Sequence, residues 1–267
     1  MEYAQVHWPS KVRREWQVSG EMYAEIARKV LADWTAGATR ERKLFRIAGQ
    51  SGSGKSSQLL PAVEAWFSER DYKPVLVATR RFVKYHPFAR EIEAEYGRGN
   101  LREMTNGVSI VLLFLVLRKL IAGGYDVVLD VPLLDPQVEG FLMGELTSAR
   151  YEVRMSLAAV SKEISDGFVA KRRDGGEKER GRVVAQATAA EFWRAMELAL
   201  GFYAKEYPGV RMVVWSAWDE GPVFDGKMGD GRMMEVVREC WGIKQMPREV
   251  DEGELAQRKV GYMRKWK

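Results

Sequence analysis

A glycine-rich motif near the start of the chain constrains the fold most strongly. Residues 49–56 read Gly-Gln-Ser-Gly-Ser-Gly-Lys-Ser, a complete match to the pattern G-x-x-x-x-G-K-[ST]. The apolar run 44–48 precedes the motif, and a helical pattern continues from Gln58. A strand, a glycine-rich turn and a helix in this order form a loop whose N–H groups point inward at a phosphate. This context favours a P-loop over a flexible Gly/Ser-rich linker.

The P-loop pattern assigns a role to each residue of the loop. Lys55 would reach the β- and γ-phosphates of a nucleotide as a point charge, and Ser56 would place its hydroxyl on the bridging Mg²⁺. We therefore expect ATP or GTP as co-substrate and Mg²⁺ as cofactor. The residues expected to bind the nucleotide are Gly49, Gln50, Ser51, Gly52, Ser53, Gly54, Lys55, Ser56 and Ser57.

The rest of the chain alternates apolar runs with helical patterns. This alternation predicts an α/β fold, a P-loop NTPase-type parallel sheet of about five strands with flanking helices. The predicted strands lie at 44–48, 75–78, 125–130, 151–160 and 210–215. We divide the chain into an N-terminal helical lead-in (1–43), a kinase-like core (44–229), and a C-terminal helix with a polar tail (230–267).

Composition narrows the setting and the partners. The 267 residues carry a net charge of +5, which suits an anionic substrate but falls short of a nucleic-acid-binding signature. A single cysteine, Cys240, indicates no disulfide framework and fits a reducing, cytoplasmic setting. The N-terminus lacks the pattern of an export signal, and the most apolar window, 108–117, is about half the length that a bilayer span requires. We expect a buried helix there and no membrane association.

The order of these pieces resembles the zeta-toxin family of P-loop kinases over residues 44 to 215. The resemblance implies a kinase that phosphorylates UDP-N-acetylglucosamine at the 3′-hydroxyl of its sugar, as a toxin held by an antitoxin. The matching features are the loop 49–57, His86-Pro87 within 82–88, the strand that ends at Asp130, Ser165 with Arg172, and the step Gly181-Arg182.

The resemblance also implies a catalytic set of Lys55, Asp130, Arg172 and Arg182. Lys55 and the two arginines would stabilise negative charge in the transition state of phosphoryl transfer. Asp130 ends a buried strand, so it would either hold Mg²⁺ as a Walker-B-like acid or act as the base. A third interpretation makes it a strand-end acid that caps a turn.

The acceptor side departs from the family pattern. Arg80 stands at the position of the family's catalytic base, and an arginine cannot accept a proton. Two acceptor-side positions of the family also differ, since Phe114 and Pro132 stand there. Arg80 and Arg81 favour an anionic acceptor, unless they are remnants of lost chemistry. We place His86 on this side as well, where it fixes the turn beside Pro87.

Three functions therefore remain open. The first is a small-molecule kinase of zeta-toxin type whose acceptor differs from the UDP-sugar. The second is a nucleotide-binding pseudokinase that engages a protein partner through residues 10–36 or 245–267. The third is a polynucleotide kinase, suggested by the basic balance and by Lys171-Arg-Arg173.

Overall fold

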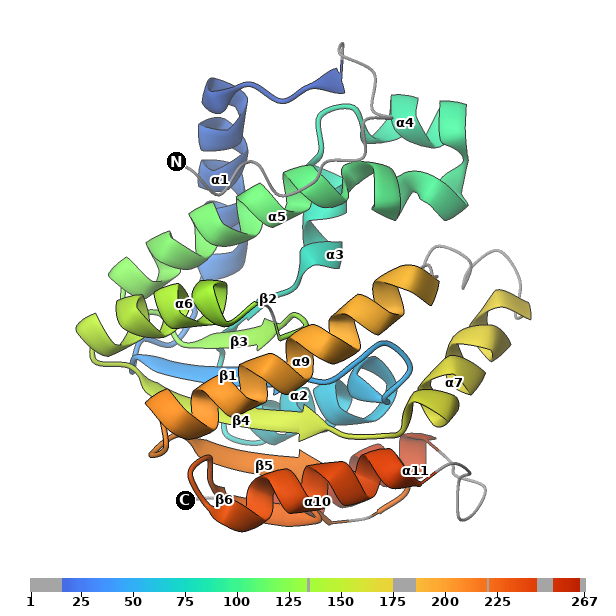
Figure 1. Ribbon diagram of the computed structural model, residues 1–267. Helices are drawn as coiled ribbons and strands as arrows, with labels where there is room; N and C mark the ends of the chain where they lie inside the picture. The colour runs from blue at the N-terminus through green and yellow to red at the C-terminus, as the bar shows by residue number, and fades with distance from the viewer. Residues whose placement is uncertain (1–15, 134, 175–185, 220, 244–251, 265–267) are drawn as a thin grey trace.

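One mixed sheet organises the molecule (Figure 1). The computed structural model describes residues 16–133, 135–174, 186–219, 221–243 and 252–264. The strands lie in the order β2-β3-β1-β4-β5-β6; β1 to β5 run parallel, and β6 is antiparallel to β5. The predicted α/β fold is confirmed. The strands are β1 (Lys43–Ala48), β2 (Val75–Val77), β3 (Val127–Asp130), β4 (Glu152–Ala158), β5 (Arg211–Trp215) and β6 (Phe224–Lys227).

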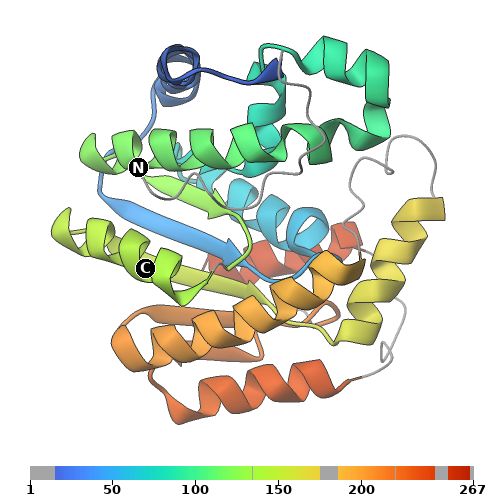
Figure 2. The same cartoon turned by 45° about the horizontal axis from the view of Figure 1, so that its top comes forward.

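Helices cover both faces of the sheet (Figure 2). One face packs against α1, α5, α6, α9 and α10, and the other against α2, η3 and α11. The helices are α1 (Gly20–Thr35), α2 (Leu60–Ser68), α3 (Thr79–Phe82), α4 (Ala89–Tyr96), α5 (Arg98–Ala122), α6 (Pro136–Ser148), α7 (Lys162–Asp174), α9 (Gln186–Glu206), α10 (Gly231–Gly242) and α11 (Glu252–Met263), with the π-turn η3 (Lys55–Leu59) and the 3₁₀-turn η4 (Val83–Tyr85).

Helix α5 is the longest of the described helices. It is long and apolar enough to cross a bilayer by length and composition, but 56% of its most apolar window is buried inside the protein. Its buried residues recur at the helical period, for example Leu112, Val116 and Leu120, and belong to the same core cluster as β1 and β3. We therefore interpret α5 as a core helix.

A buried ion pair crosses the core between β1 and α6. Arg46 and Glu139 are each 1% exposed, and their side chains are 2.7 Å apart. Arg46 also donates to the carbonyl oxygen of Pro132 (3.1 Å), and the Tyr203 hydroxyl donates to Glu139 (2.7 Å). These bonds join β1, α6, α9 and the segment after β3 through charged groups that water does not reach.

Three elements differ from the prediction. The sheet has a sixth strand, β6, on its edge beyond β5. The sequence pattern predicts that residues 97–100 separate two helices and that the second helix begins near residue 105, but α5 begins at Arg98, directly after Gly97, whose φ of 78° ends α4. The segment expected to be a polar tail forms a helix, α11, which packs on the sheet face that carries α2.

Candidate functional site

The glycine-rich loop joins β1 to η3 at the carboxyl edge of the parallel strands, where α/β folds bind ligands. Gly49, Gly52 and Gly54 have positive φ angles of 129°, 80° and 86°. A Cβ atom on Gly49 would lie 2.5 Å from the carbonyl oxygen of Ala158, and one on Gly52 would collide with the carbonyl of Ser165. Both the backbone conformation and the close approach of the β4–α7 segment therefore require glycine at these positions.

The Lys55 side chain lies across this loop. Its Nζ donates hydrogen bonds of 2.6 Å to the carbonyl oxygens of Gly49 and Gln50. Ser56, one residue later, is exposed in the first turn of the continuous helical segment η3–α2. The loop thus presents an ammonium group, a hydroxyl and helical N–H groups at one place, which suits a polyphosphate bound with a divalent cation.

Two side-chain hydrogen bonds tie the loop to the segment between β4 and α7. The Gln50 amide donates to the carbonyl oxygen of Val160 (2.6 Å), and the buried Ser165 hydroxyl donates to the carbonyl oxygen of Ser51. The loop is consequently fixed to the start of α7, the helix that carries Arg172.

An arginine and a carboxylate meet at the neighbouring strand ends. Asp130 closes β3, which pairs with β1 so that Ile47 lies opposite Asp130. Arg80 follows β2, and its guanidinium forms an ion pair with the Asp130 carboxylate. The side chain of Asp130 is 2% exposed and that of Arg80 is 37% exposed. The structure therefore pairs the arginine that stands at the family's base position with the acid that is the candidate to replace that base.

The second arginine of this segment is bound to the protein itself. Arg81 donates to the carbonyl oxygen of Leu76 in β2, and its guanidinium lies 4.3 Å from the centre of the Trp34 ring. Burial lowers the pKa of Arg81. These contacts fix the edge of β2 against α1 and leave Arg80 as the more available of the two cations.

Sequence reasoning missed one carboxylate of this region, Glu64 on α2. Burial raises the pKa of Glu64, whereas the charges of Arg80 and Arg81 lower it and the charge of Asp130 raises it further. The four side chains thus form one electrostatic group. Glu64 belongs to the helical pattern that follows the loop, nine residues after Lys55, and no sequence motif includes it.

The other predicted site residues away from the loop lie apart from the group formed by Glu64, Arg80, Arg81 and Asp130, or outside the described residues. His86 is buried, and its Nδ1 accepts a hydrogen bond from the Phe88 N–H (3.2 Å), which fixes the turn before α4. Burial lowers the pKa of His86 to about 4, although Glu91 acts in the opposite direction. Arg172 lies on α7, where only its backbone is described, and Arg182 lies outside the described residues.

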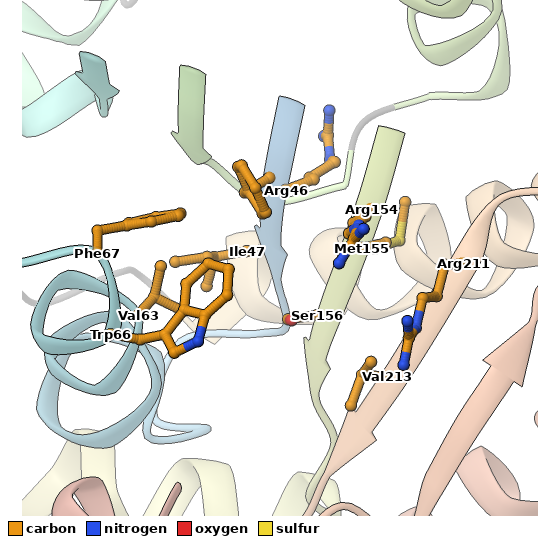
Figure 3. A pocket seen from close by; sticks show the side chains of 11 residues that line it. Arg46, Ile47, Val63, Trp66, Phe67, Arg154, Met155, Ser156, Arg211 and Val213 are labelled. Carbon is orange, nitrogen blue, oxygen red and sulfur yellow. The ribbon is translucent and has the colours of Figure 1, made fainter. Parts of the chain in front are cut away.

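A small hollow, partly open to solvent, lies elsewhere on the sheet (Figure 3). Trp66 and Phe67 of α2 form one wall, while Arg154 and Arg211 extend from β4 and β5. These strand residues belong to the amino-terminal halves of their strands, whereas the phosphate loop follows the carboxyl end of β1. We therefore do not assign the hollow to the candidate active site.

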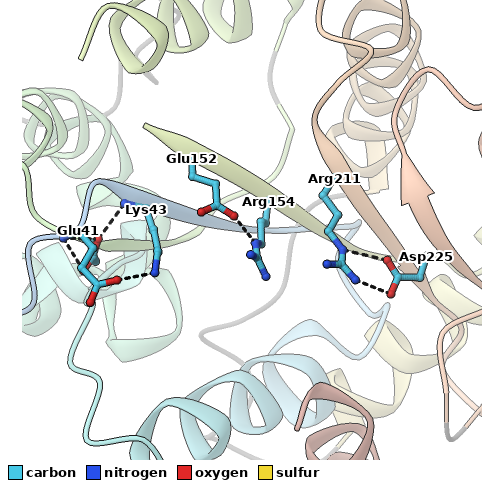
Figure 4. Close-up of polar contacts among 7 residues, drawn as sticks. Glu41, Lys43, Glu152, Arg154, Arg211 and Asp225 are labelled. Atoms are coloured by element: carbon cyan, nitrogen blue, oxygen red, sulfur yellow. Dashed lines mark hydrogen bonds and ion pairs between the residues drawn. The ribbon is translucent and has the colours of Figure 1, made fainter. Parts of the chain in front are cut away.

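The cations near that hollow are paired with carboxylates (Figure 4). Arg154 binds Glu152 at 2.7 Å, and Arg211 binds Asp225 through two hydrogen bonds of 2.9 and 3.1 Å. Lys43 and Glu41 form a third pair at the start of β1. The row of opposite charges stabilises the strand ends and does not form a basic surface for nucleic acid.

Comparison with known structures finds solved proteins that share this fold. The PezAT chromosomal toxin–antitoxin system of Streptococcus pneumoniae matches with a TM-score of 0.67 at 16% identity, over 93% of this chain and 98% of the other. The complex of AvrRxo1-ORF1 and AvrRxo1-ORF2 with sulphate ions matches with a TM-score of 0.57 at 13% identity, and the same complex with ATP matches at 0.54 and 14%. Each covers 92% of this chain and 84% of the other. These likenesses establish the fold.

The family relationship comes from the sequence itself. No curated protein sequence matches the chain significantly. The sequence profile of the family described as Zeta toxin matches residues 30–227, which is more than half of the chain and includes the phosphate loop, Arg80 and Asp130. The chain therefore belongs to the zeta toxin family.

Proposed function

We propose that the chain is a kinase that transfers the γ-phosphate of ATP or GTP to a hydroxyl of an anionic small molecule, such as a sugar nucleotide. The observation that carries the proposal is the position of Lys55 within a glycine-shaped loop one strand away from Asp130. ATP in the solved AvrRxo1 complex, a structure of the same fold, supports a nucleotide donor.

The residues present fit a Mg²⁺ ion that arrives with the nucleotide. Among the described residues, no group of three or more His, Cys, Asp or Glu side chains could hold a metal alone. Mg²⁺ in phosphoryl-transfer sites usually takes one or two protein ligands and completes its shell with phosphate oxygens and water. Ser56 would supply one ligand, and the ion would neutralise charge on the phosphates. Asp130 can serve either as a second ligand or as the base, and in the transfer step we assign it to the acceptor hydroxyl.

In this reaction the acceptor oxygen attacks the γ-phosphorus while the bond to the bridging β–γ oxygen breaks and the nucleoside diphosphate leaves. The hydroxyl proton passes to a carboxylate, for which Asp130 is the candidate. Lys55, Arg172 and Arg182 would neutralise the charge on the transferred group. Arg80, which pairs with Asp130 but remains 37% exposed, would meet an anionic group of the acceptor and so release Asp130.

The Arg80–Asp130 ion pair also favours a second candidate, a nucleotide-binding pseudokinase that acts through a protein partner. A carboxylate engaged by a guanidinium is not free to accept the proton of an acceptor hydroxyl while the pair stays closed. The solved relatives are toxin–antitoxin or two-protein complexes, so we include a protein partner of antitoxin type in the proposal.

A transfer assay with γ-labelled ATP and Mg²⁺ tests the two candidates. The acceptors are UDP-N-acetylglucosamine, other nucleotide sugars, sugar phosphates and a 5′-hydroxyl oligonucleotide. We expect a labelled small-molecule product, and a loss on the order of a hundredfold or more in Lys55→Ala, because one cationic contact to the transferred phosphate is removed. Lys119→Ala, on the exposed end of α5, is the matched control.

Three results would change the assignment. Unchanged turnover in Lys55→Ala would contradict the kinase proposal. ATP binding in a calorimeter without any labelled product would identify a pseudokinase. A labelled oligonucleotide would indicate the polynucleotide kinase.

A further inference from the structure

A buried lysine on the last helix is not explained by the proposed reaction. Lys259 of α11 is 1% exposed, and its ammonium donates to the carbonyl oxygens of Asp219 (2.8 Å) and Ser216 (3.4 Å). It also lies 5.3 Å from the centre of the buried Trp215 ring. All three partners belong to the carboxyl end of β5 or to the turn that follows it.

This turn is a compact, internally bonded unit. The Ser216 hydroxyl donates to the Asp219 carboxylate and accepts from the Asp219 N–H (3.0 Å). Burial lowers the pKa of Lys259 to about 8, and the charge of Asp219 acts in the opposite direction. The ammonium therefore holds the turn in a place that water hardly reaches, where its hydrogen bonds are strong.

The turn at residues 216–219 packs in the same cluster as Val160, which anchors the phosphate loop. Trp218 and Ala217 pack in one buried cluster with Val160 and Ile164. Val160 is the residue whose carbonyl oxygen accepts from Gln50 of the phosphate loop. A displacement of the turn would thus reach the loop through one packed side chain and one hydrogen bond.

Helix α11 reaches the loop by a second route. It packs against η3 and α2, the helical segment that begins with Lys55 and Ser56. Val260 and Met263 of α11 share a buried cluster with Leu59 and Trp66, and Arg264 pairs with Glu69 at the end of α2. Helix α11 therefore contacts the helical segment after the phosphate loop directly, and it reaches the Gln50 anchor of the loop through the turn after β5.

We propose that Lys259 is a positioning residue for nucleotide binding, which couples the docking of α11 to the geometry of the phosphate loop. The inference rests on the proposed function, because it requires that the chain binds a nucleotide. Coupling through such packed networks typically changes an affinity by about twofold to thirtyfold.

Calorimetry with Mg·ATP on the full chain tests the proposal. In Lys259→Met, which keeps the length of the side chain but removes the ammonium, we expect the Kd for ATP to rise by about threefold to tenfold. Saturating turnover should stay close to wild type, since the variant touches no reacting atom. Lys259→Arg should restore part of the affinity, and Arg258→Met, on the exposed side of the same helix, should bind like wild type.

Hydrogen exchange on the wild-type protein provides a measurement that does not depend on a variant. ATP should slow exchange at residues 216–219 and 256–263, although neither segment lies on the loop itself. A folded Lys259→Met protein with wild-type Kd, or no change in exchange at these segments, overturns the proposal. If the wild-type protein does not bind ATP, the proposed function itself fails. If the wild-type protein binds ATP and Lys259→Met binds it equally well, only the role of Lys259 fails.

Discussion

Two arginine–carboxylate pairs lie beside each other on the central strands and serve different purposes. Arg46 of β1 lies opposite Leu129, one residue before the Ile47–Asp130 pair of the same register. Because side chains alternate along strands, Arg46 points into the core under α5 and α6, while Asp130 lies on the other face, with α2. Arg46 is 1% exposed, and the side chain of Arg80 is 37% exposed.

The difference shows that burial of the cation decides what each pair can do. Arg46 has exchanged water for Glu139 and the Pro132 carbonyl, and it cannot regain water without unfolding. Arg80 remains in contact with solvent, although its partner Asp130 is 2% exposed, so an anionic ligand can reach the guanidinium. The first pair is a fixed part of the core, and the second is the pair that we propose to open when a substrate binds.

The largest effect is expected for Glu139→Gln. The substitution keeps the shape of the side chain but leaves the positive charge of Arg46 buried without a counter-charge. Such uncompensated burial costs about 3–5 kcal/mol, which urea unfolding at pH 7 will measure. The double variant Arg46→Met with Glu139→Leu should recover part of the loss, because it removes the unpaired charge but leaves the buried Tyr203 hydroxyl without its acceptor. A single variant within 1 kcal/mol of wild type would contradict the argument.

A smaller effect on the free energy of unfolding is expected for His86, whose buried imidazole is neutral at pH 7. Its folded pKa of about 4 lies below the unfolded value near 6.5, so the folded state binds fewer protons. Stability is therefore fully present above pH 6.5 and is lost as the pH falls towards 4. The total is about 3.5 kcal/mol, because the two pKa values lie about 2.5 apart and each pKa unit is worth about 1.4 kcal/mol.

Unfolding free energies between pH 7 and 4 will test this dependence on His86. His86→Asn is the matched variant, because its side-chain oxygen can accept the Phe88 N–H in place of Nδ1. The difference in pH dependence between the wild type and His86→Asn isolates this residue from the carboxylates. Parallel curves for the two proteins would show that His86 is not buried in the neutral form.

The sequence predicted the parts of the molecule that local pattern controls. The glycine-rich motif and the alternation of apolar runs were sufficient for the parallel sheet and for the loop that carries Lys55. Strand β6 was missed because Phe-Asp-Gly-Lys is short, polar and interrupted by glycine. A charged residue within the apolar run 44–48 signals a buried partner, but nothing local identifies Glu139, which lies 93 positions away.

For the acceptor side, the sequence identified candidate residues but did not predict the contacts that these residues make. Arg80 and Arg81 are adjacent and chemically identical, yet one pairs with Asp130 and the other lies on Trp34. Their contacts differ because α1 packs against β2 and brings the Trp34 ring beside Arg81. Lys259 was missed for a similar reason, since a lysine in a polar tail shows no sign of burial until α11 docks on the sheet.

The smallest effect on stability is expected for Asp130→Asn, the counterpart of Glu139→Gln. Both substitutions remove a negative charge and leave an arginine, but here water can solvate Arg80, so the loss should stay below about 1 kcal/mol. Phosphoryl transfer should nevertheless fall sharply while ATP still binds, because Lys55 and the loop remain intact. Urea unfolding, calorimetry and the transfer assay on one preparation measure all three quantities. Equal destabilisation by the two amides would show that exposure of the arginine does not separate these pairs, and the substrate-released pair proposed for the active site would then lose its basis.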